Sequence, residues 1–96
     1  MIPGNIILTQ KAEKDIDGIN DWYDKQSEGL AEDFMDGFFS ILKKVKKNST
    51  AFRFIKRGVR RCKMKRFPYY IYYSPLDKIV ILRIRHFKQQ PLKRYT

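Results

Sequence analysis

Residues 59–87 read VRRCKMKRFPYYIYYSPLDKIVILRIRHF, and side chains of different character alternate along much of this segment. A period of two is typical of β-strands, and the segment is rich in the β-branched and aromatic residues that strands favour. Pro68 and the run Ser74-Pro75-Leu76-Asp77 interrupt the pattern, as turns do. The segment therefore predicts three consecutive strands, at 59–66, 69–73 and 79–87.

The first half of the chain has a helical period instead. A short apolar run at 6–8 predicts a first strand, and Thr9 is suited to cap the helix that follows. Apolar residues then recur every three or four positions up to Lys47, with a break at 27–29, which predicts two helices joined as a hairpin. Residues 50–58 are expected to form a basic loop.

These elements predict one domain that spans residues 1–96. Their order is β-α-α-β-β-β, and apolar surface on both layers has to be buried between them. The expected fold class is therefore α+β, with the helical hairpin packed on one face of a mostly antiparallel sheet.

Charge is distributed very unevenly along the chain. From Gly37 to the C-terminus there are 18 Lys and Arg and one acid, Asp77, whereas the first 36 residues hold nine acids and three Lys. The net charge of the whole chain is +11. A field of this kind favours a polyanionic or strongly acidic partner.

Strand alternation sorts the positive charge onto one side of the predicted sheet, because successive side chains point to opposite faces. The face expected to meet the helices holds Cys62, Met64, Val80, Leu82 and Ile84. The open face is expected to hold Arg61, Lys63, Lys65, Arg83 and Arg85, together with Tyr70 and Tyr72. Cations neutralise phosphates and rings stack on bases, so this face suits RNA or DNA; the alternative is an ordinary solvated surface.

Few other residues indicate a catalytic, redox or metal-binding role. Cys62 is the single cysteine, so no internal disulfide is expected, and a reducing, cytoplasmic location is favoured. No apolar run is long enough to span a membrane, and the first residues lack a signal-peptide pattern. His86 is expected on the core face of the last strand as a partly buried structural residue. With one His, one Cys and no clustered acids, no metal site and no cofactor are expected.

Several spaced motifs resemble the RelE/ParE toxins of type II toxin–antitoxin modules, which include the plasmid-stabilisation proteins. The most specific part is RFPYYIYY at 66–73, followed by ILRI at 81–84 and then His86 and Pro91. Weaker positions that agree with it are Thr9, Ala12, Asp15, Ile16, Ile19, Trp22-Tyr23, Gly29-Leu30-Ala31, Phe34 and Val59-Arg60-Arg61. The resemblance covers nearly the whole chain. It implies a growth-arresting toxin whose working surface is the open sheet face, neutralised by a small cognate antitoxin.

Two activities are compatible with this resemblance, and the first is that of the RelE branch. Its members are ribosome-dependent mRNA endoribonucleases that need no metal. The resemblance implies catalytic roles for Lys63, Lys65 and Tyr95, and Arg83 or Arg85 could hold the phosphate. A lysine could serve as the base only if neighbouring cations lowered its pKa. Tyr70 and Gln89 stand where that branch usually has basic residues, which weakens this interpretation.

The ParE branch poisons DNA gyrase and needs no catalytic residue. The block at 67–69 and the tail with His86 and Pro91 are more similar to this branch, so a gyrase-directed toxin is the favoured hypothesis. A third alternative is a non-catalytic nucleic-acid-binding module on the same scaffold. The expected partners are a cognate antitoxin and either DNA gyrase or the ribosome with its mRNA, with no membrane and no small-molecule cofactor.

Overall fold

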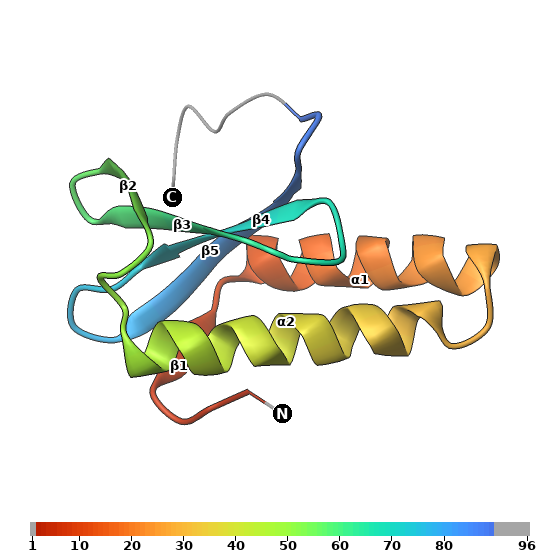
Figure 1. Ribbon diagram of the computed structural model, residues 1–96, viewed down its shortest axis with the longest axis horizontal. Coiled ribbons are helices and arrows are strands. Elements are labelled where there is room, and N and C mark those ends of the chain that lie inside the picture. Colours follow the sequence, from red (N-terminus) through yellow and green to blue (C-terminus); the bar gives the residue numbers. More distant parts are fainter. Residues whose placement is uncertain (1, 90–96) are drawn as a thin grey trace.

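The computed structural model describes residues 2–89. In it two helices lie side by side against one face of a single sheet (Figure 1). The elements in chain order are β1 (Ile6–Leu8), α1 (Gln10–Gln26), α2 (Leu30–Lys47), β2 (Arg53–Lys56), β3 (Val59–Lys63), β4 (Tyr69–Ser74) and β5 (Ile79–His86). The α+β class and the helical hairpin predicted from the sequence are confirmed.

The sheet has the strand order β1-β5-β4-β3-β2. Strand β1 pairs with β5 in parallel, and the other three pairs are antiparallel, so the sheet is mostly antiparallel as predicted. The predicted loop at 50–58 was wrong, because it contains strand β2. This strand forms a hairpin with β3, and Gly58, with a φ of 78°, supplies the left-handed conformation that the tight turn requires.

Helix α1 begins where the sequence predicts, and its first residues are fastened to the last strand. Thr9 is the N-cap: its Oγ1 accepts a hydrogen bond from the Ala12 amide at 3.1 Å and donates one to the Leu82 carbonyl at 2.9 Å. The Thr9 amide also donates to the Ile81 carbonyl. The same residue therefore starts the helix and holds it against β5.

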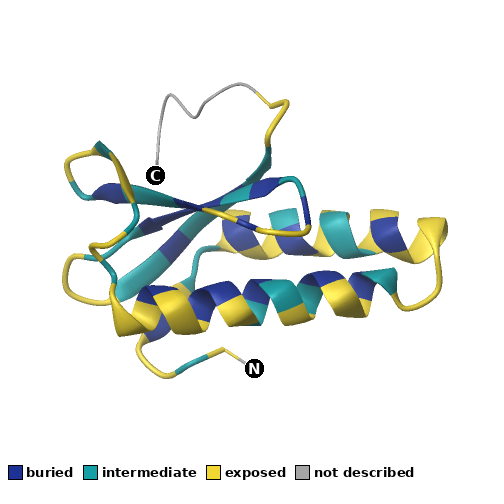
Figure 2. Ribbon diagram, in the orientation of Figure 1, coloured by how far each residue is buried: buried dark blue, intermediate teal, exposed yellow. Residues whose placement is uncertain are grey.

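The core lies between the helical layer and the sheet, where the buried positions of both layers meet (Figure 2). The largest fully buried side chains include Tyr73, Phe34, Phe38, Leu42 and Met64. The rings of Phe34 and Phe38 stack along α2, and the Tyr73 hydroxyl donates a 2.7 Å hydrogen bond to the Ser49 carbonyl. Aromatic bulk thus supplies much of the apolar surface that a chain of this length must bury.

A β-bulge in β5 changes which of its residues face the core. Tyr72 is opposite Arg83, whereas Tyr73 is opposite Ile81, so Leu82 is the extra residue of the bulge. Ile81 and Ile84 are 0% and 2% exposed, while Val80 and Leu82 are only partly buried. The prediction that Val80 and Leu82 fill the core was therefore wrong, because alternation breaks at the bulge.

Burial of Cys62 makes the fold sensitive to alkaline pH. Cys62 is 3% exposed, and burial raises the pKa of its thiol from 9.0 to about 11. The unfolded chain loses this proton near pH 9 but the folded chain keeps it, so the stabilisation is complete below that pH and is lost toward pH 11. We expect the free energy of unfolding to fall across this window, by up to about 1.4 kcal/mol per pH unit from this group.

Urea unfolding at a series of pH values measures this fall. The Cys62→Ala variant is the control, and its stability should decline less steeply over the same window. Equal slopes for the two proteins would contradict the assignment to Cys62.

Candidate functional site

Strand pairing places six of the predicted binding residues on the open face of the sheet. Residues directly opposite each other on neighbouring strands share a face. One row across the sheet consists of Lys63, Tyr70 and Arg85, and the next consists of Arg53, Arg61, Tyr72 and Arg83. Alternation thus brings these cations together as the sequence predicts. Arg53 is an addition that sequence reasoning missed, because its segment was expected to be a loop.

Aromatic rings contact two of the cations of this face, Arg61 and Lys63. The Arg61 guanidinium lies 3.8 Å from the centroid of the Tyr70 ring, and the Tyr70 and Phe87 rings are 4.6 Å apart. The Lys63 ammonium lies 5.0 Å from the centroid of the Phe87 ring. Cation–π contacts of this kind attract each cation to the ring and limit its movement. Phe87 was also missed, although it follows Arg83 and Arg85 at a spacing of two.

Tyr72 differs from the prediction that it offers a ring for stacking. It is only 3% exposed, yet it is not part of the core cluster on the helix side. Its hydroxyl lies 3.5 Å from an Arg61 nitrogen. A base could reach this ring only after the surrounding side chains moved, so Tyr70 is the more accessible of the two tyrosines.

We give the name basic face to the set Arg53, Arg61, Lys63, Tyr70, Arg85 and Phe87. Arg83 is left out because its guanidinium is held by Asp15 of α1. Its Nε and Nη2 donate hydrogen bonds to the two Asp15 oxygens, at 2.8 and 3.1 Å. The hydrogen bond to Asp15 raises the pKa of Arg83. An arginine whose charge is already balanced by a carboxylate offers less to a phosphate, so its predicted catalytic role loses support.

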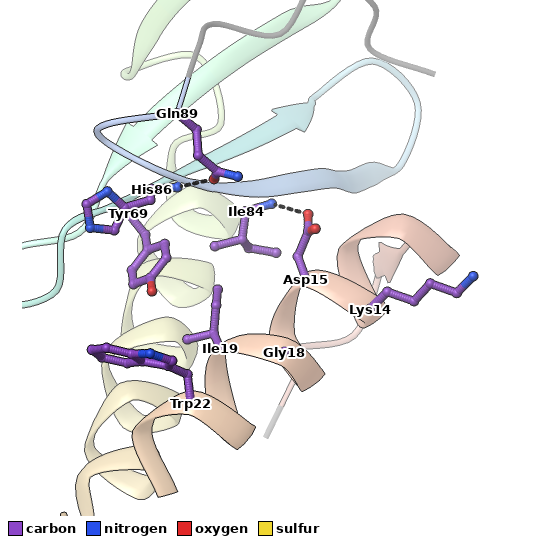
Figure 3. Close-up of a pocket in the computed structure, with 9 residues that line it drawn as sticks. All are labelled: Lys14, Asp15, Gly18, Ile19, Trp22, Tyr69, Ile84, His86 and Gln89. Atoms are coloured by element: carbon purple, nitrogen blue, oxygen red, sulfur yellow. Dashed lines mark hydrogen bonds between the residues drawn. The ribbon is translucent and has the colours of Figure 1, made fainter. Parts of the chain in front are cut away.

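Asp15 also accepts a hydrogen bond from the Ile84 amide at 3.0 Å (Figure 3). This bond satisfies an amide of β5 beyond the end of its pairing with β1. The Asp15→Asn variant should therefore lower the free energy of unfolding by about 2 kcal/mol, since a partly buried, charge-assisted pair is lost. Urea denaturation measures this change. The control is Asp33→Asn, which breaks an ion pair to Arg66 whose side chains are 47% and 65% exposed, and should cost under about 1 kcal/mol. Equal losses would contradict the structural role of Asp15.

Lys65 does not belong to the basic face, so its predicted place there was wrong. Strand β3 ends at Lys63 rather than continuing to Arg66, so alternation no longer positions Lys65. It lines a small hollow against α2 with Lys44 and Phe67, and its proximity lowers the pKa of Lys44. Tyr95, the remaining predicted catalytic residue, lies outside the described residues.

His86 lies on the core side of β5, partly buried, as predicted. Its ring makes an edge-to-face contact with Tyr69, and its Nδ1 accepts a hydrogen bond from the Lys88 amide at 3.0 Å. Both residues line a cleft of about 340 Å³ between α1 and β5, along with Trp22, which is 56% exposed (Figure 3). Burial raises the pKa of Tyr69, so its hydroxyl keeps its proton and is not a base.

Two further findings concern residues 2–89. No three side chains of the types that bind metal ions gather there closely enough to hold one. Neither helix is long and apolar enough to cross a bilayer.

Comparisons with known proteins agree with this arrangement. Residues 6–91 match the family described as "ParE toxin of type II toxin-antitoxin system, parDE". The chain is also similar to a solved structure, "Chromosomal ParDE TA system from P. aeruginosa", with 30% identity and a TM-score of 0.61 over 84% of this chain and 92% of that chain. No curated protein matches the chain.

The helical hairpin on a five-stranded sheet defines a toxin of the RelE/ParE type. The match over most of its length gives the narrower assignment: the chain belongs to the ParE toxin family of type II toxin–antitoxin systems.

Proposed function

We propose that this toxin arrests growth by binding DNA gyrase, or gyrase on its DNA, through the basic face. The observation that carries the proposal is the pair of cations, Arg61 and Lys63, that lie against Tyr70 and Phe87 on the open side of the sheet. Because the cations are already ordered, little side-chain entropy is lost when a partner binds. An acidic protein surface or a DNA backbone would complement this charge.

The positions of the predicted catalytic residues support binding over RNA cleavage. Lys63 lies over the Phe87 ring, Lys65 lines a hollow against α2, and Arg83 is paired with Asp15. Cleavage by the RNA 2′-hydroxyl would need a base, a phosphate-binding cation and an acid around one phosphate. RNA cleavage and simple nucleic-acid binding are therefore the alternatives that an experiment has to separate.

We further propose that a cognate antitoxin neutralises the toxin by covering the basic face with an acidic or amphipathic segment. The charge of that face supports this arrangement, since an acidic segment would bind it and exclude the target at the same time. The protein encoded beside the gene for this chain is the candidate antitoxin. Its co-expression should restore growth.

Three assays on the purified toxin and on cells expressing it distinguish the functions. A gyrase target predicts that cleaved plasmid DNA accumulates when the toxin is added to gyrase. An endoribonuclease predicts new 5′ ends in primer extension on total mRNA. If neither effect is seen and binding to DNA or RNA is salt-sensitive, the binding module is the correct alternative. Unchanged growth on expression of the free toxin would contradict all toxin activities.

A further inference from the structure

The cleft beside Trp22, the single tryptophan of the chain, has no part in the proposed function. It is the hollow of about 340 Å³ between α1 and β5 (Figure 3), and we call it the Trp22 cleft. Trp22 is 56% exposed, and its ring makes an edge-to-face contact with Tyr23 at a centroid distance of 5.2 Å. Tryptophan is enriched among the residues that anchor binding partners, so an exposed one beside a hollow indicates a binding site.

Gly18 keeps the Trp22 cleft open. It lies inside α1, one turn before Trp22, where glycine makes a helix less stable than alanine would. Its φ is not in the left-handed region that favours glycine, and a Cβ atom built there would meet no atom of residues 2–89 within 4 Å. Packing and backbone conformation therefore do not require this glycine. A side chain at this position would project over the cleft, so glycine leaves room there for a ligand.

Aromatic rings connect the Trp22 cleft to the basic face around the end of β5. On the basic face, the Tyr70 and Phe87 ring centroids are 4.6 Å apart. The Phe87 ring lies 6.4 Å from that of His86, and the His86 ring lies 5.3 Å from that of Tyr69. His86 and Tyr69 line the cleft. Because each step is within the range of about 4.5–7 Å that aromatic contacts span, the two surfaces are joined by a continuous series of rings.

The charge around the Trp22 cleft suits an anion. Lys14 and Asp15 are the charged residues that line it in the described part of the chain. Both Asp15 oxygens accept hydrogen bonds from Arg83, so this carboxylate is already balanced. Lys11 lies three residues before Lys14 and therefore on the same side of α1. A polyanion that crosses the basic face would meet positive charge here as well.

Two hydrogen-bond donors lie at the β5 end of the cleft, opposite Trp22 (Figure 3). His86 Nδ1 accepts the hydrogen bond of the Lys88 amide, which places the ring proton on Nε2. The Gln89 side-chain oxygen accepts a 2.7 Å hydrogen bond from the His86 amide, so its amide nitrogen is the donor that remains. A suitable ligand would present acceptor atoms to this end and a flat ring to Trp22.

We propose that the Trp22 cleft receives an unpaired base of a single-stranded nucleic acid whose backbone crosses the basic face. Bases stack on aromatic side chains and phosphates bind cations, and these two surfaces bring both groups together. A base paired inside a duplex could not reach the cleft. The inference rests on the proposed function in one respect, since both use the basic face. It goes further by naming a single strand, of DNA or RNA, as the ligand.

The first test uses the fluorescence of Trp22, which reports on the cleft because the chain has no second tryptophan. Oligomers of deoxythymidine and of uridine, about eight nucleotides long, are titrated into the purified toxin. The emission should fall as a base stacks on the indole ring. Tighter binding of the DNA strand would indicate DNA held by gyrase as the source, and tighter binding of the RNA strand would indicate mRNA.

An abasic DNA strand of the same length is the matched control. It has the same phosphates but no bases, so it should bind the basic face and leave the emission of Trp22 unchanged. The inference is wrong if the abasic strand lowers the emission as much as the deoxythymidine strand does. It is also wrong if saturating deoxythymidine and uridine strands both leave the emission unchanged.

Two variants test the cleft by affinity for the deoxythymidine strand. Trp22→Ala removes the stacking surface and should weaken binding at least about fivefold. Gly18→Leu fills the cleft and should weaken binding by a similar factor without lowering the midpoint of urea unfolding, because leucine favours a helix more than glycine does. The control is Phe54→Ala, since Phe54 is 58% exposed on the opposite edge strand, and its affinity should stay within about twofold.

The outcomes separate this inference from the proposed function. If Trp22→Ala and Gly18→Leu bind the strand like the wild type, the inference is wrong, even where the toxin still makes gyrase accumulate cleaved DNA. If both variants lose affinity but the wild type has no effect on gyrase, the gyrase target is wrong and the single-strand site stands. Loss of strand binding together with loss of the gyrase effect in the two variants supports both.

Discussion

The double variant Arg61→Glu/Lys63→Glu should lose the ability to arrest growth. Both residues belong to the basic face, where Arg61 lies against Tyr70 and Lys63 against Phe87. Reversing both charges replaces attraction by repulsion at the proposed gyrase interface, which should lower affinity by roughly 100-fold or more. Colony counts after induced expression, with gyrase supercoiling assays on the purified variant, measure this loss.

A matched variant tests whether position or total charge matters. Lys25→Glu/Lys43→Glu produces the same net charge, but these lysines are exposed on the helices. Its toxicity should remain close to that of the wild type. If the two variants are equally toxic, the basic face is not the working surface. If both lose toxicity, overall charge matters more than the arrangement on the sheet.

The second large effect concerns stability. Phe38 is 0% exposed and stacks on Phe34 at a centroid distance of 6.4 Å, in the layer between the helices and the sheet. Phe38→Ala should lower the free energy of unfolding by about 3–5 kcal/mol, because apolar contacts are lost and a cavity remains. Small domains have roughly 5–15 kcal/mol in total, so this single change should remove a large share of the stability of the fold.

Urea denaturation followed by circular dichroism measures this loss. Phe54→Ala serves as the control, since Phe54 is 58% exposed on strand β2 and should contribute under about 0.5 kcal/mol. If Phe38→Ala lowers the free energy of unfolding as little as Phe54→Ala does, the core must repack without the Phe38 ring.

The spacing of apolar residues along the chain predicted much of this fold. Both helices show the helical period in their own sequence, and three of the strands show the alternation typical of strands. The cap at Thr9, the hairpin and the side of the sheet on which Arg61 and Lys63 lie all follow from spacing alone. Strand β2 could not be predicted in this way. Residues 53–56 read RFIK, which has no alternation, and they form a strand because β3 offers its edge across a tight turn.

The errors at the site have the same cause. Val80, Ile81 and Leu82 are all apolar, so the sequence does not reveal which of them the bulge turns toward the core. The pairing of Arg83 with Asp15 joins residues that are 68 positions apart, which no local pattern reports. Lys65 was misplaced because β3 ends two residues earlier. Each of these features depends on contacts that form only in the folded chain.

The neighbour of β1 in the sheet has a consequence for the timing of toxicity. Strand β1 (Ile6–Leu8) pairs with Ile79–Ile81, although both helices and three strands lie between them in the sequence. A nascent chain therefore cannot complete its sheet until residues 79–81 have left the ribosome, and such long-range closure is slow. We expect the toxin to become active only after this closure, which leaves time for an antitoxin made alongside it to bind as folding finishes.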